Sequence, residues 1–202
     1  NGLGREISIQ LARRGCRVGI VDINAQGTAE TADLIRAEGA EVEAIVADLT
    51  ADGAPDRAID LVVNRWGGID VLINNAGIAP PRNELKTDIN MANQMKRMEG
   101  RYDELEPGNY TVDLSDEQWD RMIKIHLYGS FYGCRAALRH MQPQRSGRIV
   151  NMSSVLGLYP SSGAPHYSVA KAGIITLTKS VAGEVAPLGI NVNAICPGWI
   201  DT

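Results

Sequence analysis

The amino-acid sequence predicts an α/β fold, with one domain built around a doubly wound parallel sheet. Short runs rich in Val and Ile alternate along the chain with longer segments whose apolar residues recur at helical spacing. Such alternation is typical of a parallel sheet with helices on both faces. The chain has 202 residues, 44% of them hydrophobic and 22% charged, which suits one globular domain with a substantial core.

Five short apolar runs are predicted as strands because turn residues bound each of them. They are residues 17–22, 42–47, 69–73, 148–152 and 190–195. Four of these strands end in a polar or glycine-containing turn. The turns are Asp22, Asp48, Asn74-Asn75-Ala76-Gly77 and Pro197-Gly198. Because the carboxyl ends of parallel strands meet at one edge, we expect these turns to line a ligand crevice.

The segments between the strands are predicted as helices. They are residues 5–14, 25–38, 52–66, 117–141 and 166–186. Glycine follows each of the first three, at Gly15, Gly39 and Gly67, where a helix commonly ends. Ser115 or Asp116 is the expected N-cap of the fourth helix.

Residues 79–114 break this alternation and form an insertion in the predicted domain, which spans residues 1–202. Met91, Met95 and Met98 fall on one helical face within it, with Ile89 nearby. Two interpretations remain open. The insertion is either a surface helix packed on the domain or a neighbouring subunit, or a lid over the crevice. In a lid, the methionines would suit a bulky apolar substrate.

Composition excludes several classes of partner. A net charge of −4 argues against nucleic acid, and no apolar stretch approaches the roughly 20 residues of a membrane span. The three cysteines, Cys16, Cys134 and Cys196, are far apart and suit reduced thiols in a cytoplasmic protein. The three histidines lack metal-ligand spacing, so no metal is expected.

Tyr167 and Lys171 stand one helical turn apart, with Ser154 thirteen residues upstream of the tyrosine. Tyrosine has a reference pKa of about 10, and a nearby ammonium favours its phenolate. Residues at this spacing share one face of a helix. A serine hydroxyl at the same place can hold a substrate oxygen, so the three residues suit proton transfer to or from a hydroxyl or carbonyl group.

Ser154, Tyr167 and Lys171 follow the turn residues Asp22, Asp48 and Asn74 to Gly77 in sequence, and Pro197-Gly198 comes after them. With this order of motifs, the sequence resembles the short-chain dehydrogenase/reductase family in its common single-domain branch. The resemblance extends from Gly2 to Thr202, apart from the insertion. It implies a Rossmann-type fold, a nicotinamide dinucleotide, and hydride exchange between a secondary alcohol and a ketone.

The resemblance also implies a set of cofactor-binding residues. Gly2, Leu3 and Gly4 would let backbone amides approach the pyrophosphate at a helix N-terminus. Asp22 would accept hydrogen bonds from the adenosine ribose and repel a 2′-phosphate, which favours NAD over NADP. The remaining residues implied as cofactor neighbours are Asp48, Leu49, Asn75, Ala76, Gly77, Tyr167, Lys171, Pro197, Gly198, Ile200 and Thr202.

Asp48 has a second interpretation, because it is nearly as well suited to cap a helix close to Thr50. In the implied set it would meet the adenine edge. The sequence leaves both roles open.

The resemblance assigns Tyr167 as the acid–base residue, with Lys171 holding the nicotinamide ribose and Ser154 orienting the substrate oxygen. Ser153 is the adjacent alternative serine. The family usually has asparagine in a run like Asn-Leu-x-Gly, where it helps hold a water in a proton relay. Here the run is His126-Leu127-Tyr128-Gly129. The histidine either substitutes in that relay or marks a weakened one.

The other two histidines have weaker contexts. His166 is next to Tyr167 and either faces the substrate mouth or is simply exposed. His140 is expected to be a solvated helix residue.

By comparison with the family pattern, the chain looks truncated at both ends. A strand is expected before the glycine turn and would lie mid-sheet, between the 17–22 and 69–73 strands. We therefore expect residues 1–202 alone not to fold stably, because both neighbouring strands lack a hydrogen-bonding partner.

The sequence thus predicts an NAD-dependent oxidoreductase acting on a small alcohol or ketone. A non-catalytic nucleotide-binding regulatory module, or a ketoreductase domain of a larger multifunctional enzyme, remain as alternatives. A homo-oligomer, tetramer or dimer, is implied through the 117–141 and 166–186 helices. Small residues on the first of these suit helix contact or, equally, the sheet face: Gly129, Gly133, Ala136 and Ala137.

Overall fold

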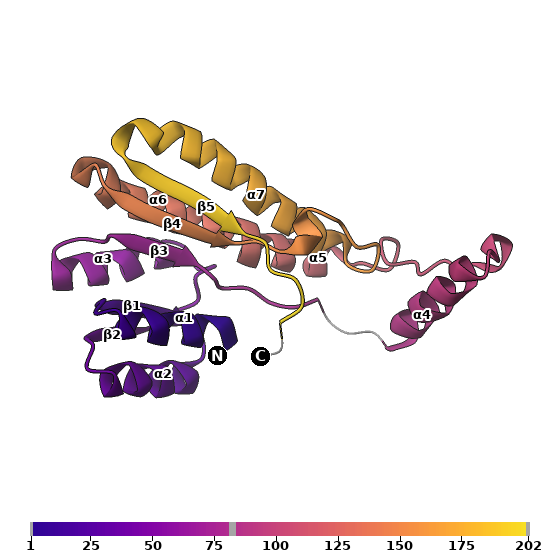
Figure 1. The fold of residues 1–202 in the computed structure, drawn as a ribbon, viewed down its shortest axis with the longest axis horizontal. Coiled ribbons are helices and arrows are strands. Elements are labelled where there is room, and N and C mark those ends of the chain that lie inside the picture. The colour runs from indigo at the N-terminus through magenta and orange to yellow at the C-terminus, as the bar shows by residue number, and fades with distance from the viewer. Residues whose placement is uncertain (1, 81–83, 201–202) are drawn as a thin grey trace.

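A computed structural model describes residues 2–80 and 84–200 (Figure 1). Thr202 lies outside the described residues. The helices are α1 Gly2–Arg13, α2 Ala25–Ala37, α3 Ala54–Trp66, α4 Glu84–Met98, α5 Asp116–Ile123, α6 Gly129–Gln144 and α7 Pro165–Val185. The strands are β1 Val18–Asp22, β2 Val42–Val46, β3 Val71–Asn74, β4 Gly147–Met152 and β5 Ile190–Ile195. The predicted alternation of strands and helices is confirmed.

Every strand pair in the described chain is parallel. β1 pairs with β2, with Val18 opposite Val42, and β3, β4 and β5 pair in that order. Within residues 2–80 and 84–200, β1 and β3 do not pair, and this is the position where the sequence analysis placed a further strand. The carboxyl ends of the strands share one side of the molecule (Figure 1).

The apolar run at residues 69–73 predicts a short buried strand, and this prediction is wrong because the strand is only partly buried. β3 begins at Val71 rather than residue 69, and Val71 is 44% exposed. Its edge away from β4 has no strand partner among the described residues, and this leaves the strand open to solvent.

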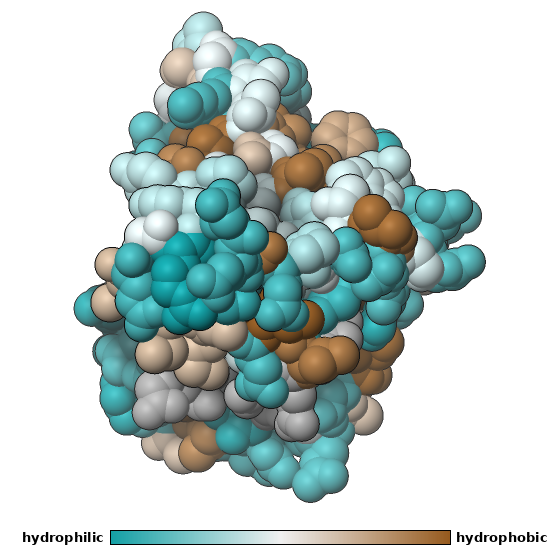
Figure 2. All heavy atoms as spheres, turned by 90° about the vertical axis from the view of Figure 1, so that its right-hand side faces the viewer, coloured by the Kyte–Doolittle hydropathy of each residue, from teal (hydrophilic) through white to brown (hydrophobic). Residues whose placement is uncertain are grey.

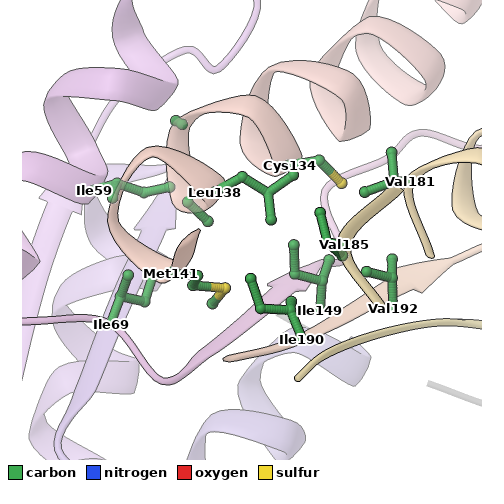
Figure 3. Packing of buried hydrophobic residues seen from close by; sticks show 12 residues of the cluster. Ile59, Ile69, Cys134, Leu138, Met141, Ile149, Val181, Val185, Ile190 and Val192 are labelled. Atoms are coloured by element: carbon green, nitrogen blue, oxygen red, sulfur yellow. The ribbon is translucent and has the colours of Figure 1, made fainter. Parts of the chain in front are cut away.

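The main core lies where α3, α6 and α7 meet β4 and β5 (Figure 3). It includes Ile59, Met141, Ile149, Val185 and Ile190. A smaller apolar cluster joins α1 and α2 to β1 and β2. Apolar side chains from strand and helix thus cover the sheet faces, as expected from the hydrophobic periodicity.

Gly133, Ala136 and Ala137 of α6 are buried. Of the two interpretations of these small residues, packing on the sheet is therefore the correct one, and contact with a helix of another subunit is wrong. Ala136 and Ala137 belong to the main core. A Cβ at Gly133 would lie 2.2 Å from Asn74 Oδ1, so only glycine allows this close approach of α6 to β3.

The helix predicted over residues 117–141 is interrupted by a π-helical turn at Lys124–Tyr128. Ser115 is its N-cap, as predicted, and forms a capping box with Gln118. The wider π turn accommodates one extra residue, and such turns often lie at functional sites. Here the turn carries His126, which is buried.

The insertion forms an arm that projects beyond the carboxyl ends of the strands (Figure 1). The packed side of α4 is largely polar. Asn93 is buried and exchanges two hydrogen bonds with the backbone of Glu106, at 2.6 and 3.0 Å. Met91, Met95 and Met98 are 57%, 60% and 81% exposed. Figure 2 shows scattered apolar patches among hydrophilic residues on this end of the molecule.

No helix in the described part of the chain is long and apolar enough to cross a membrane.

Candidate active site

The catalytic residues expected from the sequence lie close together at the carboxyl edge of the sheet. Tyr167 and Lys171 stand in the first two turns of α7, and Ser154 lies two residues after the end of β4. His126 reaches the same place from the π turn.

Lys171 is 5% exposed, and its ammonium donates a hydrogen bond to Met152 O at 2.7 Å. Burial lowers the pKa of this lysine to about 8, so the ammonium is still the main form at neutral pH. Its Nζ lies 5.5 Å from the centre of the Tyr167 ring. An ammonium has three N–H donors. Among the described residues only Met152 O accepts from it, so two donors are available for ribose hydroxyls.

Ser154 and Ser153 are both buried but make different contacts. Ser154 Oγ accepts from Leu156 N at 3.2 Å, and no described residue accepts its O–H proton. Ser153 Oγ donates to Lys171 O at 2.8 Å and so ties α7 to the end of β4. The geometry favours Ser154 as the hydroxyl that holds a substrate oxygen, with Ser153 as its structural support.

His126 is 2% exposed and lies between the loop after β3 and the ring of Tyr167. Its Nε2 is 2.9 Å from Ile78 O and 3.1 Å from Ile78 N. Its ring meets the Tyr167 ring edge-on, with 5.4 Å between centroids. A Cβ at Gly77 would lie 2.5 Å from His126 Cε1, so glycine is needed there.

The imidazole of His126 is neutral at neutral pH. Burial, and secondarily the charge of Lys171, lower its pKa to about 4. Its buried Nδ1 has no hydrogen-bond partner among the described residues. A neutral ring can donate through one nitrogen and accept through the other, so Nδ1 can bind a water or a ligand atom.

The other two histidines are placed differently. His166 is buried, so the interpretation of it as a simply exposed residue is wrong. Burial lowers its pKa. His140 is partly exposed, and its Nε2 lies 3.3 Å from Asp60 Oδ1.

The glycine turn at the start of the chain lies in the first turn of α1, which begins at Gly2 rather than residue 5. The first amides of a helix have no intrahelical partner and attract anions. A Cβ at Gly4 would lie 2.8 Å from Asn75 Nδ2, so this glycine lets α1 approach the loop after β3. The arrangement fits a pyrophosphate held by backbone amides.

Asp22 ends β1 with an exposed carboxylate. One oxygen accepts from Asn24 N at 2.9 Å, and a carboxylate keeps further acceptor capacity for ribose hydroxyls. Asp48 Oδ1 accepts from Thr50 N at 2.8 Å and from Thr50 Oγ1 at 2.7 Å. These hydrogen bonds lower the pKa of Asp48. Asp48 therefore caps a tight turn, and α3 begins later, at Ala54.

The end of β5 and the loop after it are tied to the residues on either side of Ser154. Val155 N donates to Pro197 O at 2.9 Å, and Ser153 N donates to Ile195 O at 2.8 Å. Trp199 and Ile200, further along this loop, are exposed.

A buried polar chain beneath the site was not predicted in full from the sequence. Asn74 Nδ2 donates to Asn151 Oδ1 at 2.8 Å, and Asn151 Nδ2 donates to Thr178 Oγ1 at 3.0 Å. It links β3, β4 and α7. In the sequence, the feature that could have indicated this chain is Asn151, a polar residue inside an otherwise apolar strand. Among the residues the structure describes, no cluster of three or more His, Cys, Asp or Glu could hold a metal ion.

Comparison with known proteins agrees with this geometry. The family model for short chain dehydrogenase matches residues 1–99 and 105–202. A 3-oxoacyl-(acyl-carrier-protein) reductase from Staphylococcus aureus is 36% identical, over 98% of this chain and 70% of that protein. A 2-(R)-hydroxypropyl-CoM dehydrogenase from Xanthobacter autotrophicus is 35% identical, over 100% of this chain and 72% of that protein.

Solved structures also match the whole chain. NAD⁺-bound xylitol dehydrogenase superposes with a TM-score of 0.84 at 28% identity, covering 100% of this chain and 68% of the other.

The lowered pKa of His126 leads to a prediction about how the free energy of unfolding depends on pH. The pKa of His126 is about 4 against an ordinary value of 6.5, so between these pH values the unfolded chain binds the extra proton. The free energy of unfolding should therefore fall as pH drops from 6.5 to 4, by up to about 3 kcal/mol from this group. His126→Asn, measured by denaturant unfolding at several pH values, should show a shallower decline.

The matched control is His140→Asn, which removes a partly exposed histidine from the neighbouring α6. It should keep the wild-type pH dependence of unfolding. If the free energy of unfolding of the two variants changed equally with pH, the attribution of this pH dependence to His126 would be wrong.

Proposed function

The chain belongs to the short-chain dehydrogenase/reductase family, and from this premise we propose that it is NAD-dependent and uses Tyr167 as its acid–base residue. Enzymes of this family oxidise CH–OH groups or reduce the corresponding carbonyls, and this chain is such an oxidoreductase. One observation carries the proposal. A buried ammonium at Lys171 lies beside Tyr167 at the sheet edge where Ser154 presents its hydroxyl.

The proposed substrate is a secondary alcohol or its ketone, with NAD supplying the hydride acceptor next to the reacting carbon. In oxidation, Tyr167 takes the hydroxyl proton of the substrate while Ser154 donates a hydrogen bond to the same oxygen. The Lys171 ammonium lies beside the Tyr167 ring and has two N–H groups for ribose hydroxyls. Reduction uses the same groups in the opposite direction.

The cofactor would be held along the carboxyl edge of the strands. The first turn of α1 would bind the pyrophosphate through its amides, at Gly2, Leu3 and Gly4. Residues after β3 and β5 would border the nicotinamide half.

His126 is proposed to act as a positioning residue in this scheme. Its Nε2 bonds the Ile78 backbone, donating to the carbonyl in one tautomer or accepting from the N–H in the other. Its ring contacts the Tyr167 ring, so it sets the distance between the proposed cofactor loop and the tyrosine.

NAD rather than NADP is proposed because Asp22 places an exposed carboxylate at the end of β1. A carboxylate accepts hydrogen bonds from ribose hydroxyls and repels a 2′-phosphate. The resemblance to NAD⁺-bound xylitol dehydrogenase supports this choice. The unpaired cysteines, including exposed Cys16, support the proposed cytoplasmic location, where thiols stay reduced.

Tyr167→Phe tests the acid–base assignment. The variant keeps the ring packed against His126 but lacks the hydroxyl, so turnover should fall at least a hundredfold. The protein from its complete reading frame is assayed by absorbance of the reduced nicotinamide against a panel of secondary alcohols. NAD affinity, from calorimetry, should change little.

Tyr159→Phe, a change at an exposed tyrosine, is the control and should keep wild-type turnover. A Tyr167→Phe protein with most of its activity would overturn the assignment. NAD binding without turnover in the wild type would instead favour a regulatory module.

The cofactor preference is tested by the double change Asp22→Ala with Ile23→Arg, because Ile23 is exposed beside Asp22. Losing the carboxylate and gaining a guanidinium should raise the NADP-to-NAD ratio of kcat/KM at least tenfold, or about 1.4 kcal/mol. Asp33→Ala, which removes an exposed carboxylate on α2, should leave the ratio unchanged. An unchanged ratio in the double variant would refute the role of Asp22.

A homo-oligomer, dimer or tetramer, is proposed through the outer face of α5 and α6. Trp119, Tyr128 and Phe131 are exposed there. Arg135 lies over the rings of Phe131 and Tyr132, at 5.4 and 5.0 Å. Exposed aromatic residues with arginine are enriched in protein interfaces.

Phe131→Glu should lower the molar mass measured by light scattering, because it buries a charge in the proposed interface. Leu61→Glu on α3 is the control at an exposed leucine and should keep the wild-type mass. A monomeric wild type, or an unaffected Phe131→Glu protein, would contradict this interface.

A further inference from the structure

A pocket of about 320 Å³ lies within the arm, apart from the catalytic residues. It opens between α4 and the segment that returns toward α5. Its walls come from Asn90, Asn93 and Arg97 on α4, from residues 106–112, and from Ser162 in the loop before α7. None of the residues assigned above to catalysis or cofactor binding lines it.

The charge of this pocket is set by Arg97. The lining contains one basic side chain, Arg97, and one acidic side chain, Glu106. Glu106 is offset by Lys96, whose Nζ lies 3.0 Å from its carboxylate. Within the described chain, Arg97 has no carboxylate within salt-bridge distance, although Lys86 on the same helix has one and the neighbouring Arg101 has two. The pocket is therefore cationic in a protein of net charge −4.

The walls of the pocket are held in place by hydrogen bonds. Asn93 is buried and bonds both backbone polar atoms of Glu106. Tyr110 Oη donates to Lys86 O at 2.7 Å, which ties the return segment to the start of α4. A binding site whose groups are fixed in advance loses less entropy when a ligand binds.

The pocket is connected to the catalytic tyrosine through a short stretch of chain. Ser162 precedes Tyr167 by five residues, and five residues of extended chain span at most about 18 Å. A Cβ at Gly163 would lie 3.3 Å from Asn90 and 3.5 Å from Tyr110, so the arm packs closely on this loop. One extended molecule can therefore reach both places.

We propose that this pocket binds an anionic group at the far end of an extended hydroxy or keto substrate, with Arg97 as the charged donor. Guanidinium groups form strong, often bidentate hydrogen bonds with carboxylates and phosphates. The proposal rests on the proposed function for the reacting end of the molecule. It adds the substrate class, a secondary alcohol or ketone joined by a chain to an anion.

The test compares 10-oxoundecanoate with its methyl ester as ketone substrates, with NADH as hydride donor. The two compounds differ in the terminal charge and in one added methyl group. Wild-type protein from the complete reading frame should have a KM at least tenfold lower for the carboxylate, and this advantage should shrink as salt screens the exposed guanidinium. Arg97→Gln should remove the advantage and leave kcat/KM for the ester within twofold.

The matched control is Arg101→Gln, because Arg101 lies outside the pocket lining and is paired with Glu99 and Glu104. It should keep the preference for the carboxylate. Equal KM values for the two ketones in the wild type, or an unchanged preference in Arg97→Gln, would overturn the proposal.

A second measurement distinguishes failure of the proposed reaction from failure of the proposed pocket. If neither ketone turns over, binding of 10-oxoundecanoate to the protein with NAD⁺ is measured by calorimetry. Affinity that falls at least tenfold in Arg97→Gln would still support the pocket while removing the proposed reaction. No binding at millimolar concentration would refute the pocket itself.

Discussion

The arrangement of the site depends on one buried charge, the Lys171 ammonium on the carbonyl of Met152. Removing a charge from water is costly, and the lowered pKa of about 8 reflects that cost. The charge stays in place because β4 and α7 meet closely around it. Ser153 bonds the Lys171 carbonyl, and a Cβ at Gly157 would lie 2.8 Å from the Lys171 backbone. Tyr167, one helical turn before the lysine, is thereby fixed relative to the end of β4.

Two polar connections extend this arrangement to the rest of the sheet edge. Below the site, the chain from Asn74 through Asn151 to Thr178 joins β3, β4 and α7, with Asn151 and Thr178 buried and Asn74 partly buried. At the site, His126 holds Ile78 in the loop after β3. Buried polar groups are expensive unless paired, so each connection specifies one register of the elements it joins. Tyr167 contacts the second connection through the His126 ring.

Local patterns predicted much of this structure and tertiary contacts decided the rest. Apolar runs and turn residues located all the described strands within about two residues, and motif spacing brought Ser154, Tyr167 and Lys171 together. The π turn, the exposure of Val71 and the inward direction of Gly133 and Ala137 were not predictable, because each depends on a partner distant in sequence. The methionines of α4 illustrate the same limit. Periodicity located their common face, but the polar return segment determined which face is packed.

The electrostatics of the site explain why a histidine can stand where related chains usually have asparagine. Burial and the charge of Lys171 both lower the pKa of His126, so the ring stays neutral while the lysine stays charged. The site then holds one positive charge, on Lys171. A single ammonium balances a single phenolate or alkoxide, the charge that develops when a hydroxyl proton moves. A neutral imidazole supplies one donor and one acceptor, as an amide can, without a second positive charge beside the lysine. The histidine therefore preserves the charge state that the proposed proton transfer at Tyr167 requires.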